Sequence, residues 1–267
     1  MKSTHTCCLL AVDIGNTNIT IGLFDIDKKR SACNPLKIWR LSTLEVRTAD
    51  EYAITLINML FYFGVDINKI KDVAIASVVP SLNVVFEELA KKYFGTNPCF
   101  INYKNSGGLV FAVKNPEEVG ADRIANVVAA YRAYSCSCLV IDFGTATTFD
   151  CVNSKGEYVG GAIAPGSTMS AQALSLKTAQ LPYVKMEKPM KSIGTTTIES
   201  MQSGLYFGYI GLVNELITRI KKEMEVKRII ATGGLVEPIS NEIKEIEFVL
   251  PNLTLEGILA IWQKIKS

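Results

Sequence analysis

Two apolar runs in this chain are each followed by a polar turn of the same type and then by a second apolar run. The first pair is Leu9 to Val12 and Ile19 to Asp25, separated by Asp-Ile-Gly-Asn-Thr-Asn. The second pair is Leu139 to Ile141 and Thr148 to Asn153, separated by Asp-Phe-Gly-Thr-Ala-Thr. Short apolar runs bounded by turn residues are typical of buried strands, so each pair predicts a strand, a turn and a strand. The turns begin 129 residues apart (142 minus 13), which predicts two similar halves facing each other across a ligand-binding cleft.

Helical and strand patterns alternate along the rest of the chain. Thr48-Ala49-Asp50-Glu51 is a capping-box sequence, and it predicts a helix that continues to Phe63. Further expected elements are a strand at 73–79 before Pro80, a helix at 81–94 before Gly95, a long helix at 197–226, a strand at 228–231 and a helix at 253–265. This pattern predicts an α/β fold in which helices cover a mixed sheet, with one half at 1–115 and the other at 116–267.

The repeated turn has the composition of a phosphate-binding loop. An Asp at the end of a strand can orient a magnesium ion or its water, and the Gly that follows lets the backbone approach a ligand closely. The small hydroxyl and amide residues after it offer hydrogen-bond donors to phosphate oxygens. Two such turns can hold the phosphates of one ATP. An Asp-x-Gly sequence also forms ordinary tight turns, so a purely structural role stays open for each copy.

A second candidate site lies between the two halves. Asn115-Pro116-Glu117-Glu118 predicts a helix start, and Gly120-Ala121-Asp122-Arg123 falls in the N-terminal part of that helix. Free backbone amides and the helix dipole favour an anion there, and Arg123 can add a fork-shaped contact to a carboxylate or phosphate. Asp122 is the candidate acceptor of a hydroxyl proton. An Asp-Arg pair on a helix can equally be a surface salt bridge.

Two glycine-rich segments complete the candidate set. Gly160 to Gly166 is expected to be a turn that leads into a helix beginning near Ser167, with free amides beside the Asp142 turn. Thr232-Gly233-Gly234 leaves room for a flat ring, such as adenine, against the backbone. Either segment can also be a simple connection.

Composition narrows the function and the cellular compartment. The 28 basic and 26 acidic side chains nearly balance, so no nucleic-acid partner is expected. The chain shows neither a secretory signal nor a segment long and apolar enough to span a bilayer, and no membrane partner is expected. Seven irregularly spaced cysteines indicate a reducing, cytoplasmic compartment rather than a disulfide framework or a thiolate metal site. His5 is the single histidine, which argues against Ser-His-Asp, Cys-His or phosphohistidine catalysis.

In combination, these motifs closely resemble those of type III pantothenate kinases. From Asp13 to Gly234 the chain carries, in order, Asp-x-Gly-Asn-Thr, Gly-Ala-Asp-Arg, Asp-x-Gly-Thr-Ala-x-Thr, Gly-Gly-x-Ile-x-Pro-Gly, Thr-Ala-Gln-Leu-Pro, Glu-Ser-Met-Gln-Ser-Gly and Thr-Gly-Gly. The resemblance implies two duplicated actin-like (ribonuclease H-like) lobes of the sugar-kinase/actin superfamily that close on ATP. It also implies ATP-dependent phosphorylation of pantothenate to 4'-phosphopantothenate, the first step of coenzyme A biosynthesis.

The resemblance further implies cofactors, an assembly and the role of each site residue. The cofactors are ATP, Mg²⁺ or another divalent cation, and K⁺ or NH₄⁺; the assembly is a homodimer whose active site is completed across the interface. The ATP-binding positions are Asp13, Ile14, Gly15, Asn16, Thr17, Asn18, Ile19, Thr20 and Thr145. The pantothenate positions are Gly120, Ala121, Asp122, Arg123 and Thr197, with Asp122 as the catalytic proton acceptor, and Asp142 matches the monovalent-cation position.

The long predicted helix carries a row of small residues, Gly204, Gly208 and Gly211. These glycines are compatible with close helix packing at the dimer interface, and a contact within the chain explains them equally well.

One departure from the family pattern bears on the substrate. Many relatives carry a tyrosine before Asn-Pro, near the substrate, where this chain has Val113 and Lys114. The lost hydroxyl removes one possible hydrogen bond to pantothenate.

Three other functions stay open. These are a regulatory paralogue that binds nucleotide or pantothenate without turnover, a hydrolase of polyphosphate or guanosine phosphates, and an actin-like filament protein. The presence of both Asp122 and Arg123 favours the kinase.

Overall fold

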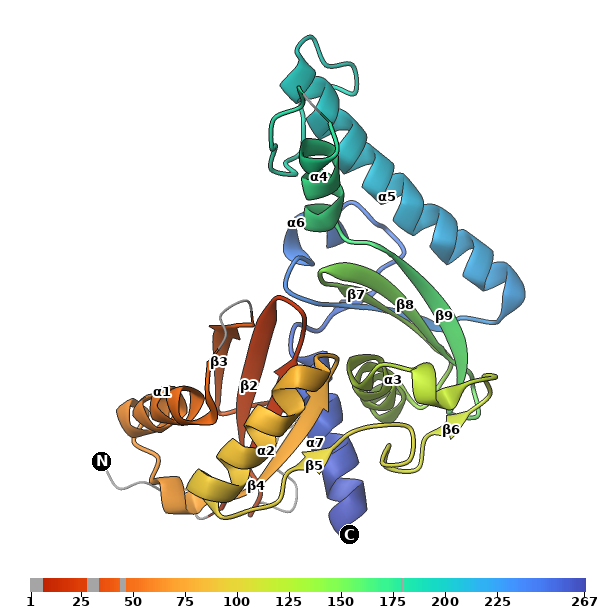
Figure 1. Cartoon of the computed structure of the whole chain (residues 1–267). Coiled ribbons are helices and arrows are strands. Elements are labelled where there is room, and N and C mark those ends of the chain that lie inside the picture. Colours follow the sequence, from red (N-terminus) through yellow and green to blue (C-terminus); the bar gives the residue numbers. More distant parts are fainter. Residues whose placement is uncertain (1–6, 28–33, 44–46, 179) are drawn as a thin grey trace. The chain divides into compact units, whose positions relative to one another are not determined.

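The computed structural model describes residues 7–27, 34–43, 47–178 and 180–267, and the chain forms two compact units (Figure 1). The first unit comprises Met1–Ala129 together with Asn252–Ser267, and the second comprises Ala130–Pro251. The bounds of these units differ from the expected division after residue 115, because the first unit continues to Ala129 and also contains the last helix. His5 and Ala179, the second residue of the Thr-Ala-Gln-Leu-Pro motif, lie outside the described residues.

The first unit is built on a sheet with the strand order β3-β2-β1-β4-β5. Central strand β1 pairs antiparallel with β2 and parallel with β4. The strands are β1 (Cys8–Ile14), β2 (Asn18–Asp25), β3 (Lys37–Ser42), β4 (Ile70–Ser77) and β5 (Cys99–Phe100).

Both faces of this sheet are covered, which explains why β1 reads as a continuous apolar run. Leu10 and Val12 pack into the cluster that contains the core side chains of α1 (Ala49–Tyr62) and α2 (Pro80–Phe94). Leu9 and Ala11 point to the other face, into the cluster formed with α7 (Leu253–Lys266) and the first part of α3 (Ala121–Tyr134). The remaining short elements of this unit are 3₁₀ turns at Ile67–Lys69 and Pro116–Glu118 and strand β6 (Val110–Phe111).

The second unit repeats the strand arrangement of the first. The strands that lie within this unit follow the order β11-β10-β7-β8-β9, and central strand β7 pairs antiparallel with β8 and parallel with β10. The strands are β7 (Cys138–Phe143), β8 (Ala146–Val152), β9 (Glu157–Pro165), β10 (Arg228–Thr232) and β11 (Phe248–Val249). Since β7 through β11 take the places of β1 through β5, the predicted duplication is confirmed.

Besides the last turn of α3, the described helices of the second unit are α4 (Ser167–Leu176), α5 (Thr197–Glu223) and α6 (Glu237–Ser240). The 27-residue α5 runs along the sheet and extends beyond it (Figure 1). Its residues Tyr209, Val213 and Ile217 are buried in one cluster with Leu139 and Ile141 of β7. The opposite end of α5 projects from the sheet, next to α4.

Several local predictions are confirmed. The Thr48 side chain accepts the Glu51 amide, and the Glu51 carboxylate accepts the Thr48 amide at 2.8 Å, which completes the capping box at α1. Helix α2 begins at Pro80 and ends at Phe94, and the next residue, Gly95, has a φ of 65°, the left-handed conformation that glycine adopts readily at helix ends.

Two local predictions are wrong. Residues 160–165 are not a turn, because they form most of β9, paired with β8; Gly160 lies at the irregularity of this pairing, with a φ of 113°. The helix predicted at Pro116 begins instead at Ala121, after a 3₁₀ turn and an extended residue, Val119. Asp122 and Arg123 consequently lie in the first turn of α3, where backbone amides lack partners within the helix.

Helix α7 joins the first unit through contacts that local sequence patterns do not reveal. The Trp262 indole donates to the buried Asp72 carboxylate at 2.9 Å, and Lys266 pairs with the same carboxylate at 2.8 Å. A Cβ atom on Gly257 would lie 2.0 Å from the Ala125 carbonyl oxygen, so only glycine allows α7 to approach α3 this closely.

We predict that Gly257→Ala destabilises the protein by about 2 kcal/mol or more, because the added methyl must displace backbone rather than a flexible side chain. Denaturant unfolding measures the change in the free energy of unfolding. Thr218→Ala, at an exposed position on α5, is the control and should change stability by less than about 0.5 kcal/mol. Equal stability of Gly257→Ala and the wild type would contradict the close approach of α7 to α3.

Candidate active site

The β1–β2 turn holds Asp13 at the end of the central strand and exposes the residues after Gly15. A 3.0 Å hydrogen bond from the Gly15 amide to the Asn18 carbonyl closes the turn. The Thr43 hydroxyl donates to the Gly15 carbonyl at 2.8 Å and anchors the turn to the residue that follows β3. Asp13 is partly buried, whereas residues 16–18 are exposed. Their amide and hydroxyl groups are therefore accessible to a ligand.

The β7–β8 turn has the same design in the second unit. Asp142 is partly buried at the end of β7, the Gly144 amide donates to the Ala146 carbonyl at 3.2 Å, and Thr145 is exposed. Gly166, just before α4, donates its amide to the Thr145 carbonyl at 3.2 Å. A Cβ atom on Gly166 would lie 2.3 Å from that carbonyl oxygen. The start of α4 is thus held against the turn by a contact that only glycine permits.

The N-terminus of α4 supplies backbone donors beside Thr145. Gly166 precedes Ser167 as the N-cap residue and has no side chain that can accept a first-turn amide. Unpaired first-turn amides and the positive end of the helix dipole favour an anion such as phosphate. Of the glycine-rich segment expected here, only Gly166 keeps the predicted place, since residues 160–165 are paired in β9.

Strand β10 ends beside Asp142. Thr232 is the register partner of Asp142, and Gly233 follows with a φ of 98°. A Cβ atom on Gly233 would lie 2.5 Å from Asp142 Oδ1 and 2.6 Å from the Phe143 carbonyl oxygen. The space that Gly233 leaves is therefore occupied by the end of β7, where the sequence suggested room for a flat ring.

Asp122 lies in the first turn of α3, close to the end of β1. Its carboxylate Oδ1 accepts the Arg123 amide at 2.8 Å. A Cβ atom on Gly120 would lie 3.5 Å from Val78 Cγ1, and the Val78 amide donates to the Ile14 carbonyl at 3.0 Å. Val78 thus bridges the predicted substrate residues and the end of β1 within the first unit.

Burial raises the pKa of Asp122 above the ordinary carboxyl range. The Arg123 amide and the Arg123 charge act in the opposite direction, but burial is the larger effect. A carboxylate with a raised pKa is a stronger base than a solvated one, which suits it to accept a hydroxyl proton.

Thr197 stands apart from the other predicted residues of the second unit. It is exposed at the first residue of α5, after the Thr196 hydroxyl that accepts the Glu199 amide. Tyr209, twelve residues further along α5 (209 minus 197), bonds to Thr147 beside the Asp142 turn. Twelve helical residues span about 18 Å. The unit therefore does not bring Thr197 to its own Asp142.

Sequence reasoning missed the side chains that brace these turns. The Thr148 hydroxyl donates to Asp150 Oδ2 at 2.8 Å, and the Tyr158 hydroxyl donates to Asp150 Oδ1 at 3.0 Å. The sequence pattern could have predicted these contacts. Thr148 and Asp150 are two residues apart and therefore lie on the same face of β8, and the hairpin pairs Thr148 with Asp142. Thr43 lies in a segment for which no element was predicted.

The Asp142 surroundings fit a small monovalent cation. The Asp142 carboxylate, flanked in register by the hydroxyl residues Thr148 and Thr232, offers hard oxygen ligands. Across the residues with described placement, no group of three or more His, Cys, Asp or Glu side chains has the arrangement of a metal site.

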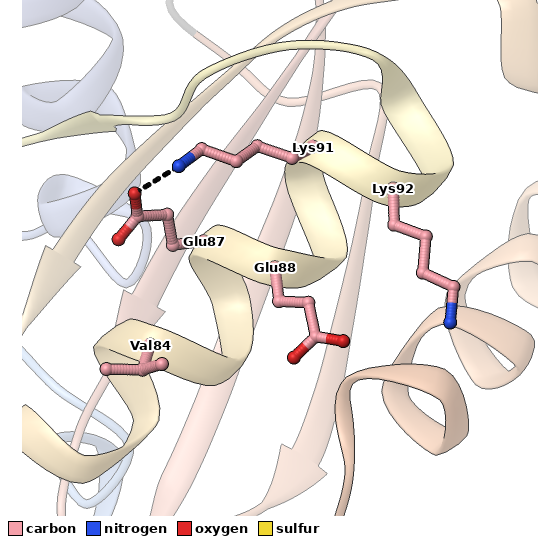
Figure 2. Close-up of a pocket in the computed structure, with 5 residues that line it drawn as sticks. All are labelled: Val84, Glu87, Glu88, Lys91 and Lys92. Atoms are coloured by element: carbon pink, nitrogen blue, oxygen red, sulfur yellow. Dashed lines mark hydrogen bonds and ion pairs between the residues drawn. The ribbon is translucent and has the colours of Figure 1, made fainter.

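A surface pocket of about 520 Å³ lies along α2, and none of the site residues named above lines it (Figure 2). It is lined by Val84, Glu87, Glu88, Lys91 and Lys92. Lys91 pairs with Glu87 at 2.5 Å, and Lys92 pairs with Asp50 of α1 at 2.8 Å. With two acidic and two basic side chains in balance, this pocket has no excess positive charge for a nucleotide.

The two units share one strand arrangement, with a carboxylate near the end of each central strand, and this duplication defines an actin-like, sugar-kinase fold. Solved structures share it: a ROK hexokinase from Thermus thermophilus aligns over 97% of this chain and 99% of its own, at 13% identity and a TM-score of 0.52. The ethanolamine utilization protein EutJ from Carboxydothermus hydrogenoformans aligns over 94% and 88%, at 15% identity and a TM-score of 0.52. At these identities the likeness concerns the fold alone.

Sequence comparison then gives the family. Residues 9–219 match the model of type III pantothenate kinase. The type III pantothenate kinase of Endomicrobium trichonymphae is 64% identical over 96% of this chain and 99% of that protein, and the one of Geobacter sulfurreducens is 47% identical over 96% and 98%. The chain belongs to the type III pantothenate kinase family and is an ATP-dependent kinase of coenzyme A biosynthesis. Over its described helices, none combines the length and apolarity needed to cross a membrane.

We predict that Gly166→Ala raises the KM for ATP by about tenfold or more, because the added methyl pushes the start of α4 away from the Thr145 turn. Steady-state kinetics with ATP and pantothenate varied separately measure the effect, which should be smaller for pantothenate. Ser175→Ala, near the end of α4, is the matched control. An unchanged KM for ATP in Gly166→Ala would contradict a role of this turn in nucleotide binding.

Proposed function

We propose that Asp122 is the base that accepts the proton of the pantothenate primary hydroxyl as the γ-phosphoryl group of ATP is transferred to it. The observation that carries the proposal is the position of Asp122 in the first turn of α3, with its carboxylate fixed by the Arg123 amide and its pKa raised by burial. Phosphoryl transfer has a loose transition state, so positioning contributes more than proton removal. Asp122 therefore orients the hydroxyl first and takes its proton late.

Arg123 and the start of α3 are the proposed pantothenate contacts, together with Gly120 and Ala121. Pantothenate carries a carboxylate, and a guanidinium can bind a carboxylate with two parallel hydrogen bonds. The first-turn amides of α3 favour the same charge. The segment before Asn115 has Val113 and Lys114 and no tyrosine hydroxyl, so the proposed binding relies on these contacts.

The ATP contacts that we propose are residues 13–20 and Thr145. Support comes from the exposed residues 16–18, from the bare backbone at Gly15 and from the α4 amides beside Thr145. A divalent cation, Mg²⁺ in this proposal, neutralises phosphate charge when bound, and Asp13 with its register partner Thr20 would hold it or its water. Asp142 would hold K⁺ or NH₄⁺, as its oxygen-rich surroundings permit.

We predict that Asp122→Asn lowers kcat by about 10²-fold or more, the usual scale for loss of a catalytic base, while the fold stays intact. Asn keeps an oxygen that can accept the Arg123 amide, so pantothenate KM should change little. Burial raises the pKa of Asp122, so the folded state favours the protonated form and the ionised carboxylate lowers stability at neutral pH. The variant should therefore unfold at a temperature equal to or above that of the wild type.

The pH profile gives an independent check on Asp122. The base works only when ionised, so kcat/KM of the wild type should fall as the pH drops through the raised pKa of Asp122. That acid limb should be absent in Asp122→Asn. Near wild-type turnover in the variant, or an acid limb unchanged by it, would exclude Asp122 as the base.

We also propose that the protein is a homodimer that associates through α5. Gly204, Gly208 and Gly211 are exposed, and a Cβ atom built on any of them would meet no described atom within 4 Å apart from the adjacent residues and backbone of α5 itself. The alternative explanation, close packing within the chain, thus finds no support. Large apolar side chains are also exposed on α4, on the segment between α4 and α5, and on the N-terminal part of α5: Met169, Leu176, Tyr183, Met190, Ile193, Ile198 and Phe207. Such an apolar surface marks an interaction site.

The position of Thr197 supports a site shared between subunits. Thr197 is exposed at the N-terminal end of α5. It lies about 18 Å along the helix from Tyr209, which contacts the Asp142 turn of the same subunit. The loop before it is held in place by the Ser203 hydroxyl, which donates to the Ser192 carbonyl at 2.6 Å. An ordered but exposed threonine at this position suits contact with substrate bound to a second copy.

We predict that mixed dimers of Asp122→Asn and Thr197→Ala recover activity that neither parent has. If Thr197 acts across the interface, one of the two sites in each mixed dimer is intact, so random mixing restores about a quarter of the wild-type rate. The rate is measured after the two variants exchange subunits. Mixing wild type with Asp122→Asn is the control for dilution.

Two results would contradict the shared site. One is a mixture that never exceeds the average of its parents, which places Thr197 and Asp122 in the same subunit's site. The other is a wild-type protein that sediments as a monomer at the concentration of the assay.

The cytoplasmic location stays a prediction. Six of the cysteines, in the part of the chain with described placement, are free thiols, and this suits a reducing compartment.

A further inference from the structure

One buried hydroxyl at the end of β10 lacks a hydrogen-bond partner. The side chain of Thr232 is 1% exposed, and its Oγ1 makes no hydrogen bond to any described residue. Removing a hydroxyl from water without giving it a partner is unfavourable, so native proteins rarely do it. An orphaned hydroxyl beside a proposed binding site therefore indicates a ligand that completes its hydrogen bonding or coordination.

The strand register places this hydroxyl beside Asp142. Thr232 on β10 is opposite Asp142 on β7, and Asp142 is in turn opposite Thr148 on β8. Register partners carry their side chains on the same face of a sheet. Asp142 Oδ1 lies only 2.5 Å from where a Gly233 Cβ atom would be, so the carboxylate leans toward β10. Three oxygen-bearing side chains thus form one row across three neighbouring strands.

The sign of the charge decides what kind of ligand this row can accept. The Asp142 carboxylate repels a phosphate or carboxylate and attracts a cation. Thr148 donates its proton to Asp150 Oδ2 at 2.8 Å, so the lone pairs of its oxygen remain available to a cation. The Thr232 hydroxyl can rotate its proton away and present its oxygen in the same manner.

The first unit provides an internal comparison. In the same frame, Asp13 is opposite Thr20 on the antiparallel side and Ala76 on the parallel side. Of the two units, therefore, only the one that contains Asp142 has a hydroxyl residue opposite the carboxylate on the parallel strand. The neighbouring buried threonine of the same unit, Thr147, does form a hydrogen bond, to Tyr209.

We propose that Thr232 is a ligand of the monovalent cation bound at Asp142, with Thr148 as the hydroxyl ligand on the other side. This inference rests on the proposed cation role of Asp142. It adds that the parallel strand supplies part of the coordination shell, so that cation binding satisfies a hydroxyl which the protein leaves without a partner.

The test measures thermal unfolding of the full-length protein against potassium concentration, without nucleotide or pantothenate. Choline chloride replaces potassium chloride to keep ionic strength constant. The proteins are wild type, Thr232→Val, Thr232→Ser and Ser137→Ala. Ser137 is a matched control, because its hydroxyl is also buried without a partner but precedes β7, at the opposite end from Asp142.

We expect the unfolding temperature of the wild type to rise with potassium and to saturate. In Thr232→Val the half-saturating concentration should increase by about tenfold or more, the usual scale for disturbing a metal site. Thr232→Ser and Ser137→Ala should titrate like the wild type. Without potassium, Thr232→Val should be at least as stable as the wild type, because valine removes an unsatisfied hydroxyl.

The outcomes separate this inference from the proposal on which it rests. If the wild type responds to potassium and Thr232→Val responds equally, the inference alone is overturned. If Thr232→Val is less stable than the wild type without potassium, or does not fold, the hydroxyl is structural and the inference is also overturned. If the wild type shows no saturable response, the cation role of Asp142 fails together with the inference, while phosphorylation of pantothenate is tested separately by product formation.

Discussion

Each unit of this molecule depends on the register of one central strand, which pairs antiparallel with one neighbour and parallel with the other. Hydrogen bonds on both sides hold β1 and β7 so that Asp13 and Asp142 fall at the next-to-last position of each strand, just before a tight turn. A slip by one residue would move every side chain of the strand to the other face, and with it the carboxylate. The side chains of β1 pack against helices on both faces, so a slip would exchange side chains of different size and shape and disrupt that packing.

Within each unit, glycines allow close backbone approaches between elements that are distant in sequence. Gly166 brings the start of α4 to the Thr145 turn, Gly233 brings β10 to Asp142, and Gly257 lets α7 pack on α3. None of these contacts tolerates a Cβ atom. Since phosphoryl transfer is catalysed mainly by positioning and by preorganised charge, a site built on backbone contacts of this kind suits the reaction.

The sequence was most informative where local chemistry and hydrophobic pattern agree. The two strand, turn, strand units, the capping box of α1 and the Gly95 stop of α2 were all predictable, because each depends on residues near one another in the chain. Strand β9 was not, since its glycines resemble a loop until β8 is available to pair with them. The place of α7 and the orphaned hydroxyl of Thr232 depend on tertiary contacts with distant residues, so no local pattern reveals them.

The most direct test of the account is product analysis by mass spectrometry after the purified full-length protein is incubated with magnesium, potassium, pantothenate and γ-¹⁸O-labelled ATP. We expect labelled phosphate in 4'-phosphopantothenate, with one molecule formed for each ADP released. ADP release with labelled inorganic phosphate and unmodified pantothenate would contradict the account, because it would show that the site delivers the phosphoryl group to water rather than to the hydroxyl that Asp122 is proposed to orient.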